Sequence, residues 1–347
     1  MKISPSYDVI VVGSGPAGAA AARTLVIHGY SVLILEKKKL PRYKMCSGMI
    51  GQRSQDLIEM HFGDIPETVL CTLPHLKGSR FCIKEDSFVD APIEKPYYFN
   101  VWRSKFDNWL VNQSGAEVLD GHELIGFKQA GKTIHATVRM FDKEKIQIEA
   151  SYLIGADGAN SRVRKLLSPS FNKKINWFIH EQLYCLGKIN LEHEYFYGFL
   201  NPSFSAFYAW VNFKDEYLVY GVSTSRGESI EPYLRNFTEY LEKNFQLEVE
   251  RIVRKNGCLS VDMGIRGNFI LGQNRVLLVG EAAGFMNRFG EGISSALSTG
   301  HVAAEAIDQA NKSGKDAFSI YSALAGPEKE MTINSWEEAK AIAGRDF

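Results

Sequence analysis

The chain has 347 residues, of which 45% are hydrophobic and 23% charged, and this composition excludes a disordered or fibrous protein. Lys and Arg together number 40, as do Asp and Glu, so no net charge attracts the chain to nucleic acid or to anionic lipid. Because single hydrophobic cores stop growing at about 250–300 residues, we expect two domains.

The five cysteines favour a reducing compartment. Their number is odd and no pair has C-x-x-C spacing, which argues against a disulfide framework, a zinc ribbon and a cysteine-ligated iron–sulfur cluster. The first residues lack the layout of a signal peptide, and no run of 18 apolar residues occurs. We therefore expect a cytoplasmic protein with no metal, while peripheral membrane contact stays open.

The N-terminal residues predict a βαβ unit. Residues 7–12 form an apolar, β-branched run that indicates a buried parallel strand, and residues 16–28 are rich in Ala and Leu and end at Gly29, as a helix does. Residues 31–35 predict a second buried strand. A right-handed crossover should connect the two strands.

The rest of the chain predicts a mixed α/β fold. In order, we expect a helix at 103–110, hairpin strands at 134–140 and 145–150, a short strand at 152–154, an antiparallel sheet within 177–224, a helix at 231–245, a strand at 275–279 and a long helix at 293–311. We assign 1–75, 100–170 and 265–347 to a Rossmann-type domain, and 76–99 and 171–264 to an inserted substrate domain rich in antiparallel strands.

A glycine fingerprint follows the first strand and opens the first helix. Gly13 permits a tight turn, Gly15 permits close approach of a pyrophosphate, and Gly18 permits close packing of helix on strand. Glu36 ends the second strand, where a carboxylate accepts hydrogen bonds from a ribose. The expected dinucleotide ligands of this segment are Gly13, Gly15, Pro16, Ala17, Gly18, Glu36 and Lys37.

Two further segments, at 154–164 and 275–284, together with the R-x-x-F-D pattern that begins at Arg103, accompany this fingerprint in the same order as in a known family. The chain resembles the flavoproteins that include aromatic hydroxylases, flavin halogenases and geranylgeranyl reductases. This resemblance implies FAD as the cofactor and an aromatic-hydroxylase-like fold. It also implies that Arg103 belongs to the cofactor site.

The resemblance implies roles for residues of the two later segments. Asp157 would approach the dinucleotide from its turn, and the segment at Gly280 and Glu281 would hold the ribityl chain and pyrophosphate, although the family usually has Asp in place of Glu281. The N-terminus of the long helix would face the flavin N1–C2=O edge and stabilise the anionic reduced flavin. The residues at that helix end are Gly290, Gly292 and Ile293.

Two features resemble the reductase branch of the family. Cys46, Ser47 and Gly48 stand where geranylgeranyl reductases carry a Cys-containing glycine segment, so these three residues would contact the cofactor and Cys46 would lie near the isoalloxazine. Tyr208 and Trp210 belong to a stretch similar to the reductase Y-x-W-x-F-P-K pattern. These three residues, Cys46, Tyr208 and Trp210, are the catalytic candidates. The alternatives are a small buried thiol and ordinary strand packing.

The resemblance favours an FAD-dependent reductase that transfers hydride to a carbon–carbon double bond of an apolar, prenyl-like substrate. Two alternatives stay open: an oxygen-dependent monooxygenase or halogenase on the same fold, and a flavin-binding scaffold protein without turnover. No second glycine fingerprint occurs, so electrons should come from transiently bound NAD(P)H or from a ferredoxin-like protein. Only residues 321–347 follow the long helix, fewer than in familiar geranylgeranyl reductases, which usually use that region to wall a lipid cavity.

Overall fold

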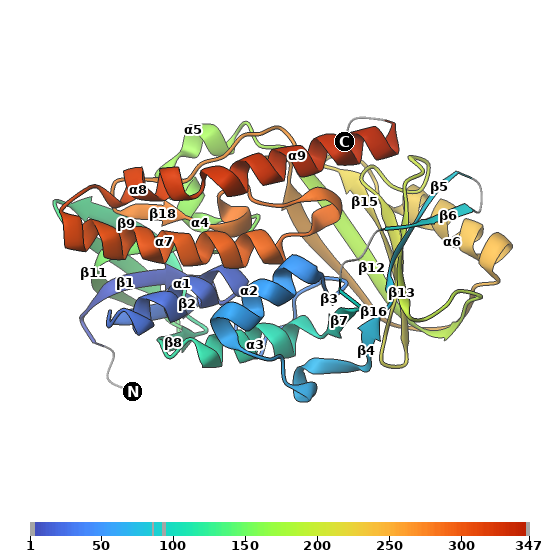
Figure 1. Ribbon diagram of the computed structural model, residues 1–347, viewed down its shortest axis with the longest axis horizontal. Helices are drawn as coiled ribbons and strands as arrows, with labels where there is room; N and C mark the ends of the chain where they lie inside the picture. Colours follow the sequence, from blue (N-terminus) through green and yellow to red (C-terminus); the bar gives the residue numbers. More distant parts are fainter. Residues whose placement is uncertain (1–3, 85–86, 92–94, 345–347) are drawn as a thin grey trace.

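The computed structural model describes residues 4–84, 87–91 and 95–344, which form two large sheets beside each other (Figure 1). The first sheet has eight strands, with the parallel strands β8, β2, β1, β11 and β18 in that order at its centre. Antiparallel strands β9, β10 and β17 extend it. The bounds are β1 Ser6–Val12, β2 Val32–Glu36, β8 Glu117–Asp120, β9 Glu123–Ala130, β10 Thr133–Arg139, β11 Lys145–Gly155, β17 Gly272–Gln273 and β18 Val276–Leu278.

The second sheet has seven strands in the order β16-β12-β15-β14-β13-β5-β6, and only β5 and β13 pair in parallel. All of its strands lie within the ranges predicted for the substrate domain, while the domain boundaries themselves stay a prediction. A small sheet has the order β3-β7-β4. The bounds are β3 Met49–Ile50, β4 Leu70–Leu76, β5 Gly78–Lys84, β6 Ser87–Asp90, β7 Tyr98–Val101, β12 Trp177–Lys188, β13 Tyr195–Phe199, β14 Ala209–Lys214, β15 Tyr217–Ser225 and β16 Glu248–Val261.

The helices lie over both sheets. Figure 1 shows α1, α7 and α8 together over the parallel sheet, α6 beside the far side of the second sheet, and α9 running from one half of the molecule to the other. None of the helices in the described residues is both long and apolar enough to cross a membrane. The bounds are α1 Pro16–Ile27, α2 Gln52–Phe62, α3 Arg103–Gln113, α4 Arg162–Leu167, α5 Pro169–Asn172, α6 Glu231–Phe245, α7 Ile293–Ser313, α8 Ala317–Leu324 and α9 Gly326–Ala343, with 3₁₀ turns η1 Glu67–Val69, η2 Gly280–Ala282 and η3 Arg288–Gly290.

Side-chain alternation gives the second sheet two different faces. On β15, Leu218, Tyr220 and Val222 pack with Phe237 and Leu241 of α6 in one apolar cluster. The alternate residues of the sheet face the first domain. This face therefore remains available to line a cavity between the two sheets.

The predicted βαβ unit, hairpin and helices are present, with one difference in the strands. Residues 145–150 and 152–154 were expected to form two strands, but β11 is continuous. Its first half forms an antiparallel pair with β10, and its second half forms parallel pairs with β1 and β18. One strand can serve both partners because the two patterns use successive parts of the same extended backbone.

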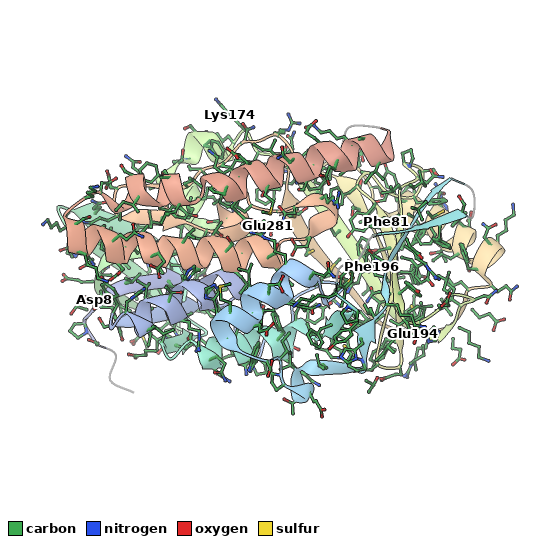
Figure 2. All side chains as sticks on the ribbon, in the orientation of Figure 1. Asp8, Phe81, Lys174, Glu194, Phe196 and Glu281 are labelled. Carbon is green, nitrogen blue, oxygen red and sulfur yellow. The ribbon has the colours of Figure 1, made fainter. Side chains whose placement is uncertain are left out.

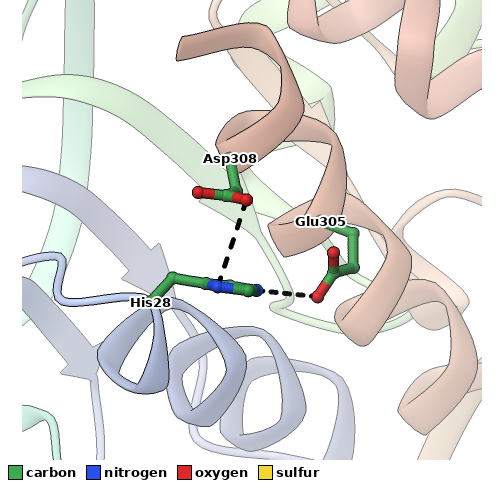
Figure 3. A group of neighbouring side chains, drawn as sticks. All are labelled: His28, Glu305 and Asp308. Carbon is green, nitrogen blue, oxygen red and sulfur yellow. Dashed lines mark hydrogen bonds and ion pairs between the residues drawn. The ribbon is translucent and has the colours of Figure 1, made fainter. Parts of the chain in front are cut away.

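Helices α1 and α7 approach each other very closely. An ideal Cβ on Gly300 of α7 would lie 2.2 Å from the carbonyl oxygen of Ala17 in α1. Near the other end of α1, His28 lies between two carboxylates of α7, with Nε2 2.8 Å from Glu305 and Nδ1 4.0 Å from Asp308 (Figure 3). His28 therefore links the C-terminal end of α1 with α7 through its contacts with these two side chains.

We predict that Gly300→Ala lowers the free energy of unfolding by about 1–3 kcal/mol, because the added methyl group overlaps the Ala17 backbone and overpacking has this cost. Helix propensity alone favours Ala, but only by about 1 kcal/mol. Urea unfolding measures the change. Gly326→Ala is the matched control, since an ideal Cβ there has no neighbour within 4 Å. Equal effects of the two substitutions would contradict the close approach.

Candidate functional site

A cavity of about 1520 Å³ lies between the two sheets. Glu281 lies at the junction of the two halves in Figure 2, while Phe196 and Phe81 lie on the side of the second sheet. Of the residues predicted for the site, all but Gly18 and Gly48 line this cavity. Those that do are Gly13, Gly15, Pro16, Ala17, Glu36, Lys37, Cys46, Ser47, Arg103, Asp157, Tyr208, Trp210, Gly280, Glu281, Gly290, Gly292 and Ile293.

The two exceptions have packing roles. An ideal Cβ on Gly18 would lie 2.0 Å from the Gly13 carbonyl oxygen, so Gly18 lets α1 pack onto the turn that follows β1. An ideal Cβ on Gly48 would lie 2.0 Å from the Val101 carbonyl oxygen and 2.3 Å from Lys214 Nζ. Gly48 therefore lies behind the cavity wall, whereas the sequence placed it among the cofactor contacts.

Three helix N-termini border the cavity. The N-caps of α1, α2 and α7 are Gly15, Gly51 and Gly292, which have no side chain to cap the helix. At α7 the Glu291 carboxylate instead accepts from the Ser294 amide at 2.9 Å, so the free N–H groups are those of α1 and α2 and the remaining ones of α7. Free N–H groups at a helix N-terminus carry about half a positive charge, which stabilises bound anions. Such a surface fits the pyrophosphate and the anionic reduced flavin of FAD.

Glu36 has one acceptor position left for a ligand. Its Oε2 accepts hydrogen bonds from Ser14 Oγ at 2.6 Å and Arg42 Nε at 2.9 Å, and its Oε1 accepts from the Lys38 amide at 2.9 Å. Burial alone would raise the pKa of the Glu36 carboxyl, but Arg42 and Ser14 outweigh it and leave that pKa lowered. The second lone pair of Oε1 is the position at which a ribose hydroxyl fits.

A chain of buried ion pairs connects Glu36 with Cys46. Arg42 donates from Nη1 to Asp107 at 3.0 Å, in addition to its bond with Glu36. Arg103 donates from Nε and Nη2 to the same Asp107 carboxylate, at 2.7 and 3.0 Å, and also hydrogen-bonds Cys46. Two carboxylates and two guanidiniums therefore neutralise each other along the cavity wall, and the second guanidinium holds the thiol.

The Cys46 thiol is more acidic than an ordinary cysteine. Burial raises the pKa of this thiol, but the Arg103 charge, the Gly48 amide and Lys44 outweigh burial and leave the pKa lowered. By contrast, burial raises the pKa of Cys71, Cys185 and Cys258 to about 11. An acidic thiol beside a cavity differs from the inert buried thiol that the sequence left as the alternative.

Glu281 presents a buried carboxylate to the cavity. Its Oε1 has no hydrogen-bond partner among the described residues, although it is shielded from solvent. Burial raises the pKa of Glu281, and Lys44 and Arg164 only partly oppose this rise. An unsatisfied buried oxygen is costly unless a ligand donates to it, and the hydroxyls of a ribityl chain are suitable donors.

Asp157 and Arg288 have structural partners of their own. The Asp157 carboxylate accepts from Ser161 Oγ at 2.5 Å and from the Arg162 amide at 2.6 Å, so it fixes the turn before α4. Arg288 pairs with Glu338 of α9 and is 39% exposed. Asp157 thus shapes the wall of the cavity, and Arg288 connects this wall with α9.

The floor of the cavity is the free face of the second sheet. Trp210, Phe196 and Met45 form an apolar cluster, against which Tyr208 packs, and Met45 is the neighbour of Cys46 in the chain. His180 lies on the same floor, with Nδ1 2.7 Å from Ser223 Oγ and Nε2 2.6 Å from Ser260 Oγ. Burial lowers the pKa of His180 to about 4, so its imidazole is neutral at physiological pH.

Sequence reasoning missed several cavity residues. They have no motif of their own, because their cavity position depends on strand pairing or on ion pairs between distant segments. A stretch of alternating polar residues in a predicted strand was the one signal that could have indicated the floor. The missed residues are Arg42, Lys44, His180, Gln182 and Asn256.

Helix α9 completes the cavity. Trp336 is fully buried, and its Nε1 donates to the Met286 carbonyl at 2.6 Å. Arg53 of α2 forms an ion pair with the buried Glu328. Residues after α7 therefore form part of the cavity wall. Four of the residues that line the cavity are exposed apolar side chains, which we term the apolar rim: Ile83, Val89, Met331 and Ile342.

We predict that Cys46 is the first cysteine to react with iodoacetamide near pH 7.5 in the flavin-free protein, because only a thiolate is alkylated. Lys44→Gln should raise the pKa of this thiol and slow its alkylation, whereas Lys37→Gln is the control. Peptide mass spectrometry over a pH series identifies the site and its pKa. Equal labelling of Cys46 and Cys258 would contradict the effect of Arg103.

Comparisons with known proteins indicate the family of this chain. A family model described as an FAD binding domain matches residues 6–304. Geranylgeranyl diphosphate reductase of Rhodobacter capsulatus is 32% identical over 324 residues, which are 90% of this chain and 77% of that protein.

Two solved structures share the fold. A geranylgeranyl bacteriochlorophyll reductase-like protein of Thermoplasma acidophilum has a TM-score of 0.81 at 20% identity, covering 97% of this chain and 88% of its own. A myxobacterial FAD-dependent chondrochloren halogenase has a TM-score of 0.77 at 17% identity, covering 98% and 83%. The chain thus belongs to the FAD-binding flavoprotein family that includes geranylgeranyl reductases, flavin halogenases and aromatic hydroxylases.

Proposed function

We propose that this flavoprotein reduces a carbon–carbon double bond of an apolar, prenyl-like substrate. The observation that carries the proposal is an acidic thiol, Cys46, beside an aromatic floor in a large cavity with an apolar rim. The 32% identity with a geranylgeranyl diphosphate reductase supports the same reaction class. Small-molecule cavities are commonly apolar with a few placed polar groups, as this one is.

Bound FAD, once reduced, supplies a hydride. The protein's own residues have three tasks. The N-termini of α1 and α7 stabilise negative charge on the cofactor. Glu36 and Glu281 accept hydrogen bonds from its hydroxyl groups. Cys46 provides the proton for the second carbon, because Arg103 stabilises the thiolate that remains. The wall formed by α9 limits the access of water to these groups.

Tyr208 is the second candidate for the proton donor. Burial raises the pKa of its phenol well above the ordinary value, so Tyr208 releases a proton less readily than Cys46 does. It packs near Phe196 and Phe207 on the floor, with Trp210 beside it. We therefore assign substrate positioning to Tyr208 and Trp210, and proton transfer to Cys46.

The electron donor that we propose is NAD(P)H, bound transiently, or a ferredoxin-like protein. The cavity is already large enough for FAD and a substrate, and the sequence contains a single glycine fingerprint. A peripheral position at a membrane would give the apolar rim access to lipid substrates.

One observation favours oxygen-dependent chemistry as a second candidate. The chain shares its fold with an FAD-dependent halogenase, and a cavity lysine, Lys44, acts electrostatically on Cys46, His180 and Glu281. Lys44 therefore lies near the place where the reaction is expected. Consumption of oxygen distinguishes this candidate from a reductase.

We predict that the purified protein holds FAD without a covalent bond and that Glu36 contributes to its affinity. Glu36→Gln should raise the FAD dissociation constant about tenfold, and Glu36→Ala about a hundredfold, because a hydrogen bond to a charged acceptor contributes about 1.5–3 kcal/mol. Fluorescence titration of deflavinated protein measures both. Glu117→Gln, which changes a carboxylate bonded to Tyr7, is the control. Unaltered FAD affinity in both Glu36 variants would show that Glu36 does not bind the cofactor.

We predict that the anaerobically reduced protein transfers two hydrogens to a polyprenyl substrate and that Cys46→Ala lowers this rate about 10²–10⁴-fold, the range for loss of a positioned proton donor. Melting temperature and flavin content should stay nearly constant. Flavin absorbance and product mass are the measurements. A reaction that requires oxygen and inserts oxygen or halogen would establish the second candidate instead.

A further inference from the structure

Tyrosine and tryptophan side chains form a line from the cavity to the protein surface. Tyr43 lines the cavity, and the buried Tyr184 lies next to it, with ring centroids 6.4 Å apart and hydroxyl oxygens 3.3 Å apart. The indole of Trp102 stacks on Tyr184 at 5.7 Å, with an interplanar angle of 20°. Tyr217 of β15 packs against both rings, 6.4 Å from Trp102 and 6.2 Å from Tyr184. These four rings are therefore in successive contact.

A second branch of this line begins on the cavity floor. Trp210 donates from Nε1 to Gln182 Oε1 at 3.3 Å, and Gln182 Nε2 donates to the Tyr184 hydroxyl at 2.6 Å. Tyr208 packs beside Trp210, with ring centroids 5.7 Å apart. Two branches from the cavity thus converge on Tyr184.

Glycines make room for the rings of the floor. An ideal Cβ on Gly221 would lie 2.3 Å from the Trp210 ring, and one on Gly198 would lie 2.6 Å from the Phe81 ring. Each ring therefore occupies space over a neighbouring strand. For Trp210, this position brings the indole N–H to Gln182, which continues the second branch.

The inner ends of the line lie beside the groups expected to meet the flavin. Tyr43 and Tyr208 both pack against the apolar cluster that contains Met45 and Trp210. Met45 is the neighbour of Cys46, and all of these residues line the cavity. An oxidised group in this part of the cavity therefore has an aromatic ring of the line close to it.

The outer end of the line reaches solvent. Trp102 and Tyr217 are partly exposed, whereas Tyr184 is 3% exposed. Each outer ring has a carboxylate for its proton, since Trp102 Nε1 donates to Asp215 at 2.7 Å and the Tyr217 hydroxyl donates to Glu216. An indole or phenol that loses one electron becomes strongly acidic. A carboxylate that takes the proton therefore stabilises the neutral radical at this end.

Nearby cations also make the proton acceptors important. Lys214 Nζ lies 4.9 Å from the centroid of the Trp102 ring, and the Arg254 guanidinium lies 4.8 Å from that of Tyr43. A cation opposes positive charge on a ring, so oxidation of either ring requires loss of its proton. Tyr43 donates to another phenol, which is a far weaker base than the Asp215 carboxylate beside Trp102. Oxidation is therefore less costly at the outer end.

We infer that these rings form a route for single electrons, from a reductant in solvent at Tyr217, through Trp102 and Tyr184, to an oxidised group in the cavity. Electron transfer falls off exponentially with distance. Rings in contact therefore pass an electron much faster than one long step from the surface does. The inference requires bound FAD, and it is independent of the substrate and of the proposed double-bond reduction.

The step balances with blue light and oxidised FAD, because an excited oxidised flavin takes one electron from a nearby tyrosine or tryptophan. Electrons then move inward from ring to ring, so the oxidised site moves outward to Trp102 and Tyr217. The indole proton passes to Asp215, or the phenolic proton to Glu216. A one-electron reductant in solvent replaces the electron, and the carboxylate returns the proton. The net change is transfer of one electron from this reductant to the flavin.

Flash photolysis of the anaerobic holoprotein tests the inference, with ferrocyanide as the reductant. A blue flash should produce the absorption of a tryptophanyl or tyrosyl radical, and ferrocyanide should remove this signal while the flavin stays reduced. Tyr184→Phe should lose most of the ferrocyanide-dependent photoreduction, because phenylalanine is far harder to oxidise and both branches meet at this ring.

A second variant removes the outer end of the line and keeps Tyr184. The double substitution Trp102→Phe with Tyr217→Phe should lose the same photoreduction. Tyr220→Phe is the matched control, since Tyr220 is a buried tyrosine on the opposite face of the same sheet, where it packs with Phe237 of α6. It should leave the radical yield and lifetime unchanged. Flavin content and melting temperature show that the variants are folded.

The outcomes decide the route. Loss of photoreduction in Tyr184→Phe and in the double variant, but not in Tyr220→Phe, establishes it. Equal photoreduction in all the proteins, an equal loss in Tyr220→Phe, or no protein radical after the flash overturns it. The double-bond reduction is measured in the dark, so its success or failure is a separate result.

Discussion

The close approach of α1 and α7 is the constraint on which the cofactor site depends. Because Gly300 has no side chain, the backbones meet at Ala17, and two helix N-termini are directed at the same cavity. At α1 the N-terminus contributes positive potential without a titratable group, whereas at α7 the Glu291 carboxylate accepts from the Ser294 amide. The first domain can therefore stabilise a polyanion while the chain as a whole remains neutral.

The buried charges along the cavity wall also compensate one another. Arg42 and Arg103 share Asp107, and each also holds one functional group, Glu36 or Cys46. A buried charge with no partner would be strongly destabilising, whereas these four alternate in sign. As a result, the Glu36 carboxylate and the Cys46 thiol belong to one electrostatic unit.

Local signals predicted much of the fold and most of the named residues that line the cavity. The glycine turn at Gly13 and the helix start at Ile293 are encoded by neighbouring residues, so the sequence alone identified them. The contact of Arg42 with Asp107 joins residues 65 positions apart, and no local pattern indicates it. The alignment of Asn256 with Trp210 depends on the register of four strands. Helix α9 was also missed, because its role depends on where it packs.

Gly198 and Gly221 have a consequence for the size of the cavity. Each makes space for an aromatic ring of the neighbouring strand by the absence of a methyl group. A methyl group on Gly198 would meet only the Phe81 ring, whereas one on Gly221 would also lie 2.4 Å from the Glu181 carbonyl oxygen of the paired strand. The depth of the floor at Phe81 can therefore change by one point mutation, Gly198→Ala, while the strand pairing that supports the site is preserved.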